Sequence, residues 1–194
     1  MKILVYCVCS VGFNPIKCCE KMESLKINEV GHNEIQELQR IGKLTFKETF
    51  SASNSEDDMN KYLNENFSLE KITTEFNDKN SLFYFAKEDG NILGYLKLNF
   101  GDSQTELKDH KGLEIERIYV LKEFHGKKVG QLLFEKALKI AEEKKVDYVW
   151  LGVWEENLRA INFYKKNGFE EFDKHIFKLG NDEQTDIMMK LNLK

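Results

Sequence analysis

Two segments in the second half of the chain carry residue types that bind phosphate or move protons. The first runs from Phe124 to Gln131 and reads Phe-His-Gly-Lys-Lys-Val-Gly-Gln, where a predicted strand gives way to a predicted helix. Backbone N–H groups and the helix dipole at such a junction hold phosphate oxygens, and two lysines add positive charge. The run lacks the ending of a Walker A loop and the glycine fingerprint of dinucleotide-binding folds. We therefore expect a phosphate-binding loop of another kind, with a plain turn as the alternative.

The second segment combines a helix signature with a tyrosine that can exchange a proton. It runs from Trp154 to Phe169, with Asn157 suited to the N-cap of a helix and Gly168 to the position after its end. Tyr164 falls two turns after Asn157, so the two side chains share one helical face. A phenol on that face is a candidate general acid. The simpler alternative is that Asn157 only caps the helix and Tyr164 only packs on the sheet.

These segments need a scaffold, and the periodicity of apolar residues predicts an α/β chain. Helices are predicted at 34–50, from Ser53 onward, and at 69–76, 130–144 and 158–167. Strands are predicted at 25–30, 81–87, 92–100, 113–121, 146–154, 169–179 and 186–193. Turns at Asp89-Gly90 and Gly180-Asn181 join antiparallel neighbours, whereas helical crossovers join parallel ones. The prediction is a mixed sheet covered by helices.

Composition favours one folded domain with a short extension. Of 194 residues, 41% are hydrophobic, and the net charge of −4 lacks the basic excess of a general nucleic-acid binder. All four cysteines precede Met22, so disulfides cannot hold the rest of the chain together, and we predict a cytoplasmic location. The chain has no run of 18 apolar residues and hence no predicted membrane span. We expect residues 1–21 outside the domain and residues 22–194 as the domain itself.

Both functional segments resemble motifs of the GNAT superfamily of acyl-CoA-dependent N-acyltransferases. The pyrophosphate loop of that family runs Gln/Arg-x-x-Gly-x-Gly/Ala, and 125–130 matches it with two departures, His125 for the first residue and Lys128 for the usual glycine. The second motif, Asn-x-x-Ala-x-x-Phe/Leu-Tyr-x-x-x-Gly-Phe, matches at every defining position from Asn157 onward. The resemblance implies a mostly antiparallel sheet with a central splayed parallel pair and helices on both faces.

Longer strings narrow the resemblance to bacterial spermidine/spermine acetyltransferases of the PaiA type. They are Leu-Glu-Ile-Glu-Arg-Ile-Tyr-Val at 113–120, Trp-Leu-Gly-Val-Trp-Glu at 150–155, and Gly-Asn-Asp-Glu-Gln-Thr-Asp at 180–186. His175 and Asp186 match the tail of that group, with their roles open. Two alternatives remain, an acetyltransferase for peptide N-termini or another small amine, and a non-catalytic acyl-CoA-binding regulator. The departures in the loop would favour the regulator.

The resemblance also implies a cofactor site for acetyl-CoA, which serves as the co-substrate. The loop would hold its pyrophosphate, and backbone amides of the strand before it would polarise the thioester carbonyl. The implied cofactor-binding residues are Ile118, Tyr119, Val120, His125, Gly126, Lys127, Lys128, Val129, Gly130, Gln131, Asn157, Ala160, Tyr164 and Lys166. No metal is expected.

Acetyl transfer to an amine needs both a base and an acid. An alkyl ammonium, with a pKa of about 10, must lose a proton before it attacks, and the departing thiolate must gain one. In an ideal strand Glu114 and Glu116 point the same way, opposite Arg117 and Tyr119, so either glutamate is a candidate base. The resemblance favours Glu116, with Tyr164 as the acid. Two alternatives stay open: a solvated strand face that carries both glutamates, and a bulge that changes the alternation.

A polyamine acceptor carries several positive charges and would prefer an acidic groove. The predicted substrate-binding residues are Glu48 and Asp57, the latter from an acidic run that also holds Glu56 and Asp58. The helix dipole alone would also explain an acidic first turn. Neither nucleic acid nor membrane is an expected partner, and the sequence leaves both a monomer and a homodimer open.

Overall fold

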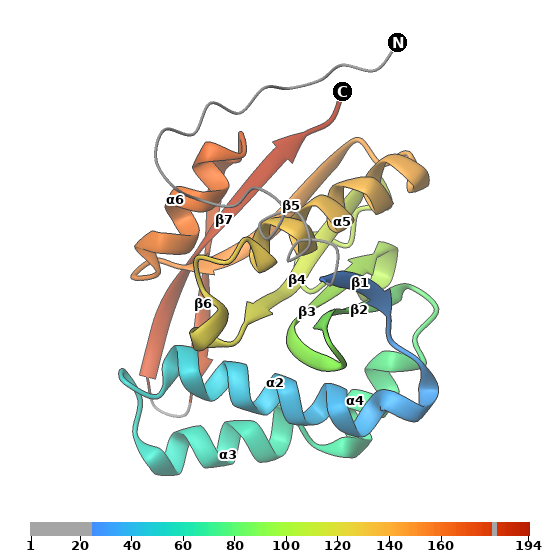
Figure 1. Ribbon diagram of the computed structural model, residues 1–194. Coiled ribbons are helices and arrows are strands. Elements are labelled where there is room, and N and C mark those ends of the chain that lie inside the picture. The colour runs from blue at the N-terminus through green and yellow to red at the C-terminus, as the bar shows by residue number, and fades with distance from the viewer. Residues whose placement is uncertain (1–24, 180–181) are drawn as a thin grey trace, which may run out of the picture.

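In the computed structural model, which describes residues 25–179 and 182–194, seven strands form one sheet in the order β1-β2-β3-β4-β5-β7-β6 (Figure 1). β4 and β5 pair in parallel, and every other neighbouring pair is antiparallel. The strands are β1 (Lys26–Glu29), β2 (Ser81–Glu88), β3 (Asn91–Phe100), β4 (Gly112–Val120), β5 (Tyr148–Trp154), β6 (Glu170–Leu179) and β7 (Asp182–Asn192).

Within those residues, five α-helices cover the sheet, with α2, α3 and α4 on one face and α5 and α6 on the other (Figure 1). Side chains fix where helices begin: the Ser55 hydroxyl accepts a hydrogen bond from the N–H of Asp58, and the Asn157 carbonyl oxygen accepts one from the N–H of Ala160. None of these helices is long and apolar enough to cross a membrane. The helices are α2 (Ile35–Phe50), α3 (Glu56–Asn66), α4 (Leu69–Phe76), α5 (Val129–Lys144) and α6 (Leu158–Lys166).

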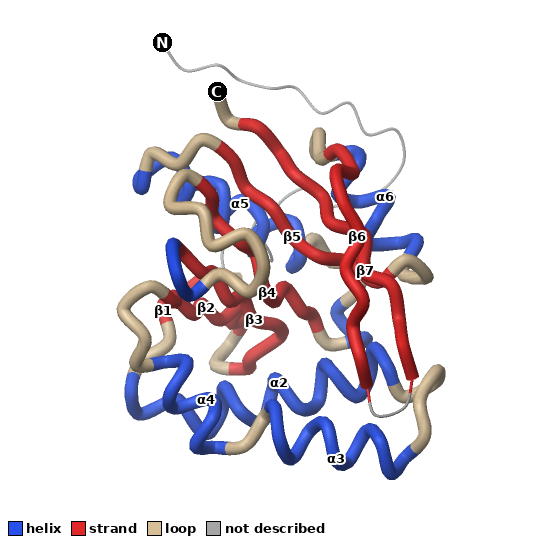
Figure 2. The backbone as a smooth tube through the Cα atoms, turned by 180° about the vertical axis from the view of Figure 1, so that it is seen from behind, coloured by secondary structure: helices blue, strands red, loops and turns tan. Residues whose placement is uncertain are grey.

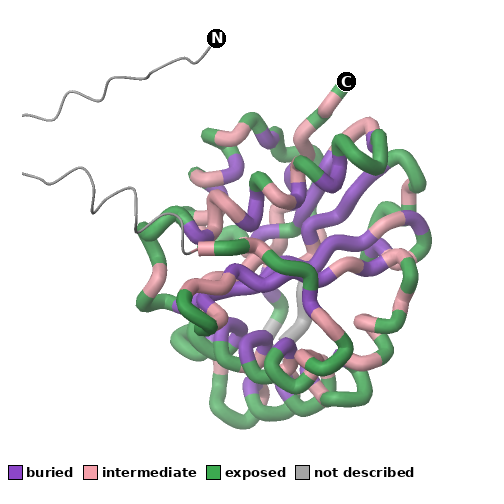
Figure 3. Tube along the Cα trace, turned by 45° about the vertical axis from the view of Figure 1, so that its right-hand side comes forward, coloured by how far each residue is buried: buried purple, intermediate pink, exposed green. Residues whose placement is uncertain are grey.

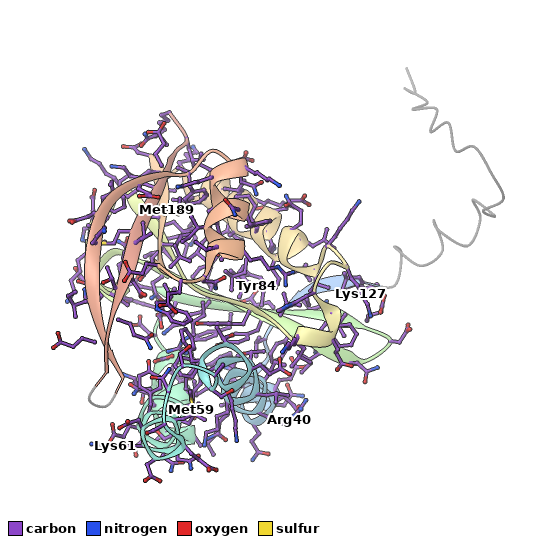
Figure 4. The ribbon with its side chains drawn as sticks, turned by 90° about the vertical axis from the view of Figure 1, so that its left-hand side faces the viewer. Arg40, Met59, Lys61, Tyr84, Lys127 and Met189 are labelled. Carbon is purple, nitrogen blue, oxygen red and sulfur yellow. The ribbon has the colours of Figure 1, made fainter. Side chains whose placement is uncertain are left out.

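Alternation along the central strands fills a separate core on each face of the sheet. In β2, Phe83 and Phe85 pack with the α2–α4 layer, whereas Tyr84 packs with α5 and α6. Figure 3 shows buried residues concentrated on the inner strands, and Figure 4 shows Met59 on the α3 side and Met189 on the α5–α6 side. The two cores pack the central strands from both sides.

The parallel pair at the centre of the sheet is splayed, as the resemblance implies. β4 and β5 pair only at Gly112 with Tyr148, Leu113 with Val149, and Glu114 with Trp150. Beyond these pairs β4 continues along β3 and β5 continues along β7, so a gap opens between the two strands. In Figure 2 the strands β1–β4 form one group and β5–β7 another.

A bulge in β4 corrects the expected alternation of its side chains. Lys97 of β3 pairs with Arg117 and the next residue, Leu98, pairs with Ile115, so Glu116 is an extra residue in β4. Because of it, Glu116 and Arg117 both face the α2–α4 layer instead of opposite sides of the sheet. The prediction that the two glutamates point away from Arg117 and Tyr119 was therefore wrong.

Two further predictions concern the end and the beginning of the chain. β7 begins at Asp182, four residues before the predicted start, because its polar first residues extend the ladder with β6 beyond the apolar core. The predicted turn at 180–181 and the predicted extension at 1–21 lie outside the described residues.

Candidate functional site

Two adjoining cavities open where β4 and β5 separate. The first, of about 630 Å³, lies between the end of β4, the loop at 122–128 and the starts of α5 and α6, and we call it the loop cavity. The second, of about 350 Å³, lies between the same strands and the helices α2 and α3, and we call it the aromatic cavity. Seven residues line both: Thr49, Ile118, Tyr119, Trp154, Asn157, Ala160 and Tyr164.

The loop before α5 has the backbone of an anion-binding turn. Gly126 has a φ of 79° and Lys128, the N-cap of α5, has a φ of 63°, both in the left-handed region. The first helical bond of α5 runs from the N–H of Leu132 to the carbonyl of Lys128, so the three preceding N–H groups have no acceptor within the helix. Those groups and the positive end of the helix dipole face the loop cavity.

Most residues predicted to bind the cofactor line the loop cavity, and two do not. Lys127 lies on the ring of Phe124, 4.6 Å from its centre, and Figure 4 shows it at the outer end of the loop. Lys166 is exposed on α6 outside the lining. The twelve that line the cavity are Ile118, Tyr119, Val120, His125, Gly126, Lys128, Val129, Gly130, Gln131, Asn157, Ala160 and Tyr164.

His125 positions a guanidinium through the contacts of its two ring nitrogens. Its Nε2 lies 2.8 Å from the carbonyl oxygen of Val120, so Nε2 bears the proton. Its Nδ1 then accepts a hydrogen bond from the Nη1 of Arg159, at 2.6 Å. Arg159 thus adds a cation to the loop cavity, a role that the sequence analysis did not assign.

Aromatic rings from α2, α3 and β5 form one wall of the aromatic cavity. Phe46 stacks on Tyr62 with ring centres 4.7 Å apart, and Phe50 lies 5.7 Å from Trp154. Phe67 completes the group beneath the Arg117 guanidinium, which lies 5.0 Å from its ring centre. Such a wall attracts cations and apolar chains alike.

Glu116 lies in a buried ionic network on the floor of this cavity. Its carboxylate contacts Lys97 at 2.6 Å and Arg117 at 2.9 Å, and both cations also contact Glu75. Burial by itself raises the pKa of Glu116, but Arg117 and Lys97 outweigh it and hold the pKa at about 2. Glu116 therefore stays ionised and is a weak proton acceptor. Lys97, a charged residue within the mostly apolar predicted strand at 92–100, was the feature of the sequence that indicated a buried ionic partner.

Glu114 lies beside the network, 3% exposed. One carboxylate oxygen accepts hydrogen bonds from the Thr105 N–H at 2.9 Å and from the Asn99 amide at 3.0 Å, and the other accepts from the Thr105 hydroxyl. Burial and the nearby charge of Glu116 raise the pKa of Glu114 despite these hydrogen bonds. Both glutamates named by sequence thus reach the aromatic cavity, in different environments.

Three further titratable groups line the aromatic cavity where β6 and β7 border it. His175 and Asp186 pair across β6 and β7, and the His175 Nδ1 lies 3.4 Å from a Glu106 carboxylate oxygen. Burial raises the pKa of Asp186 to about 6, although His175 opposes the shift. The sequence analysis left His175 and Asp186 without a role and did not single out Glu106.

The structure does not bring the predicted substrate-binding carboxylates to the aromatic cavity. Glu48 lines the loop cavity, where it accepts a hydrogen bond from the N–H of Lys122 at 2.9 Å. Asp57 is exposed in the first turn of α3, outside both cavities, where it complements the helix dipole. Acidic residues next to the rings therefore come from β4, β7 and the 104–111 segment instead.

Tyr164 is buried where the two cavities meet. Its ring packs 5.3 Å from Phe163 and 5.5 Å from Phe169, and burial raises its pKa above the ordinary value. The phenol therefore keeps its proton at neutral pH and can donate it. Within the described residues, no group of three His, Cys, Asp or Glu side chains is arranged to hold a metal ion.

Comparison with known proteins identifies the family behind this geometry. The sequence profile of the Acetyltransferase (GNAT) family matches residues 43–169. An uncharacterized N-acetyltransferase from Lactobacillus delbrueckii subsp. lactis is 43% identical over 169 residues, 87% of this chain and 98% of its own. A spermidine N(1)-acetyltransferase from Thermoplasma acidophilum is 27% identical over 154 residues, 77% of this chain and 91% of its own.

A solved structure agrees with the sequence matches. The PaiA N-acetyltransferase from Thermoplasma acidophilum, in complex with coenzyme A, superposes with a TM-score of 0.71 at 25% identity, covering 87% of this chain and 99% of its own. The superposition supports the mixed α/β fold described above, with its parallel pair β4–β5. The chain therefore belongs to the GNAT family and is an acetyl-CoA-dependent N-acetyltransferase.

Proposed function

We propose that this N-acetyltransferase acetylates a primary amine of a polyamine such as spermidine or spermine, by direct transfer in a ternary complex. The acceptor binds in the aromatic cavity, and acetyl-CoA binds in the loop cavity. The relatives that act on spermidine or carry the PaiA name support the acceptor class at 25–27% identity.

The observation that carries the proposal is the lining of the aromatic cavity. Rings alternate there with four carboxylates, from Glu106, Glu114, Glu116 and Asp186, against the single guanidinium of Arg117. Rings bind the methylene segments and ammonium groups of a polyamine, and carboxylates attract its charges. A neutral amine would make the apolar contacts alone.

The loop cavity supplies the complementary features for the cofactor. The N–H groups at the start of α5, with Lys128 and Arg159, would hold the pyrophosphate. Unpaired backbone groups where β4 and β5 separate would hydrogen-bond the pantetheine arm, which offsets the cost of leaving them without partners. When bound, acetyl-CoA supplies an activated acyl group as a thioester.

Tyr164 lies at the junction, where the acyl group must pass from one cavity to the other. Its phenol would protonate the departing thiolate, whose conjugate acid has a pKa of about 8.5 if it behaves like cysteine. Backbone amides near Tyr119 would polarise the carbonyl oxygen. The domain at 22–194 lacks a cysteine nucleophile, which supports attack by the amine itself instead of a Cys-linked acyl-enzyme.

The test measures CoA release with spermidine, spermine, butylamine and an alanine-initiated peptide at several salt concentrations. Each remote ammonium beside an exposed carboxylate contributes about 0.5–1 kcal/mol, so two contacts give about a 5- to 30-fold preference in kcat/KM for the polyamines. The preference should weaken as salt rises. Equal kcat/KM for butylamine and the polyamines, insensitive to salt, would contradict the polyamine acceptor, and a preference for the peptide would favour N-terminal acetylation.

A matched pair of variants locates the charge that gives this preference. Glu106→Gln removes a carboxylate from the aromatic cavity and should shrink the preference for spermidine over butylamine. Asp57→Asn removes one from the exposed start of α3 and should leave the preference unchanged. If Asp57→Asn shrank the preference and Glu106→Gln did not, the acceptor would instead bind at the acidic first turn of α3.

A further inference from the structure

We propose that Asp186 is the general base that takes the proton from the acceptor ammonium. The inference rests on the proposed acetyl transfer and adds the residue that makes the amine nucleophilic. The proposed base then lies on β7, on the other side of the gap from Glu114 and Glu116 of β4.

The hydrogen bonds and ion pairs of the other carboxylates argue for this choice. Glu116 is paired with Lys97 and Arg117, and a proton placed on it would break two buried ion pairs. Glu114 accepts three hydrogen bonds from Thr105 and Asn99, which leave little lone-pair capacity for a substrate. Both carboxylates are thereby held for structure and for electrostatic attraction.

Asp186 differs in having no such partners. Among residues 25–179 and 182–194, no hydrogen bond or ion pair engages its carboxylate, although it lines the aromatic cavity. A glycine on the neighbouring strand gives it room: a Cβ on Gly152 would lie 3.6 Å from its Oδ2. A carboxylate that lines the cavity and is not engaged by these neighbours is available to an incoming amine.

The strand pairing puts Asp186 near the reaction centre. It pairs with Trp154 of β5, and Trp154 lines both cavities, as Tyr164 does. Asp186 therefore borders the aromatic cavity close to its junction with the loop cavity. The proposed base and the proposed acid come from β7 and α6, around one opening.

The charged and titratable groups facing Asp186 come from each element packed around it. His175 lies opposite on β6, with Glu106 beyond it, while Tyr62 of α3 and Tyr119 of β4 feel its charge. Burial outweighs the attraction of His175 and leaves the pKa at about 6. Asp186 is thus ionised at neutral pH yet more basic than an ordinary aspartate, as a general base should be.

The protons balance in this scheme. The ammonium gives one proton to Asp186, the freed lone pair forms the C–N bond, and the C–S bond breaks as the Tyr164 phenol protonates the thiolate. The second proton lost by the nitrogen restores the phenol. Asp186 then releases its proton to solvent, so each turnover yields one amide, one CoA thiol and one free proton.

The experiment compares Asp186→Asn with Asp173→Asn, a matched loss of an exposed carboxylate on β6 outside both cavities. For the wild type, kcat/KM against pH with spermidine should rise through a pKa of about 6. Asp186→Asn should lose that rise and fall about 100- to 10,000-fold in kcat/KM at pH 7, with an unchanged Kd for CoA. Asp173→Asn should behave like the wild type.

Two further measurements keep the inference separable from folding and from the proposed function. His175→Gln should move the rising limb to higher pH, because it removes the charge that opposes the raised pKa of Asp186. A full rate and an intact rising limb in Asp186→Asn would overturn this inference alone, as would a limb that His175→Gln leaves in place. A wild type that binds CoA but acetylates no amine would overturn the proposed function and this inference with it.

Discussion

At the scale of single residues, a substitution at Tyr164 can separate the chemical step from cofactor binding. Tyr164→Phe removes the phenolic proton and keeps most of the ring packing against Phe163 and Phe169. We expect turnover to fall about 10- to 1,000-fold with little change in the Kd for CoA. Single-turnover acetylation of spermidine, with CoA binding measured by calorimetry, tests it. An unchanged chemical step would leave Tyr164 with a packing role alone.

Asp186 should destabilise the folded protein at neutral pH, because its carboxylate is partly buried and has no hydrogen-bond or ion-pair partner among the residues that the structure describes. Its pKa is raised from 3.8 to about 6, so the folded state binds more protons than the unfolded state between these values, and stability falls as pH rises through that window. Asp186→Asn removes the titrating carboxylate and with it this pH-dependent loss of stability. We expect its Tm to exceed that of the wild type above pH 6 and the difference to shrink toward pH 4. A lower Tm for the variant at every pH would contradict this.

The sequence identified single residues where one motif contained them, and missed those that meet across the fold. Asn157 and Tyr164 share a helix face, so spacing alone brought them together. By contrast, Lys97 of β3 contacts both Glu116 and the Glu75 carboxylate of α4, and no local pattern links the three. Such contacts depend on the strand register and on the bulge. Both are set by how the strands pair, and the composition of the chain does not reveal them.

At the scale of elements, α5 is bounded at both ends by a lysine in the left-handed region. Lys128 is its N-cap, with a φ of 63°, and Lys145 its C-cap, with a φ of 57°. A side chain with a Cβ is strained there, while glycine is not. This explains why the motif of the family has glycine at the position of Lys128.

The two lysines give a matched pair of variants. Lys128→Gly and Lys145→Gly should each raise the free energy of unfolding by up to about 1 kcal/mol, since relief of strain exceeds the added entropy of the unfolded chain. Only Lys128→Gly should also weaken CoA binding, by about 2- to 5-fold, because it removes an exposed positive charge from the loop cavity. Chemical denaturation and calorimetry measure both effects. Equal CoA affinity in the two variants would mean that the Lys128 charge does not contribute.

Element boundaries followed from the sequence where apolar periodicity was strong and failed where pairing alone extends a strand. The predicted helix at 130–144 matches α5 to within one residue at its start. β7, in contrast, begins with polar residues, so its first pairs with β6 left no hydrophobic signal in the sequence. The bulge at Glu116 was likewise invisible, because one inserted residue does not change composition.

At the scale of the whole molecule, three pairs of residues join the half-sheet β1–β4 to the half-sheet β5–β7. The remaining connection runs through side chains of the helices on either face and through hydrogen bonds between the 104–111 segment and the start of β5. Beyond Glu114 and Trp150, the backbone N–H and C=O groups on the facing edges of β4 and β5 have no strand partner in the part of the chain that the structure describes. The sheet is therefore continuous from β1 to β6 but has its shortest strand pairing at its middle.

That short pairing should be visible as slow breathing of the protein. Among the amide hydrogens of the sheet, those on the gap-facing edges of β4 and β5 should exchange fastest in the free protein. CoA at about 100 times its Kd should slow their exchange about a hundredfold. Amides between β2 and β3 should not change. If the ligand protected all strands equally, the two half-sheets would open as one unit. If CoA protects only the gap-facing amides, the cofactor joins the two half-sheets as well as reacting. The enzyme is then most rigid while it holds the molecule that it consumes.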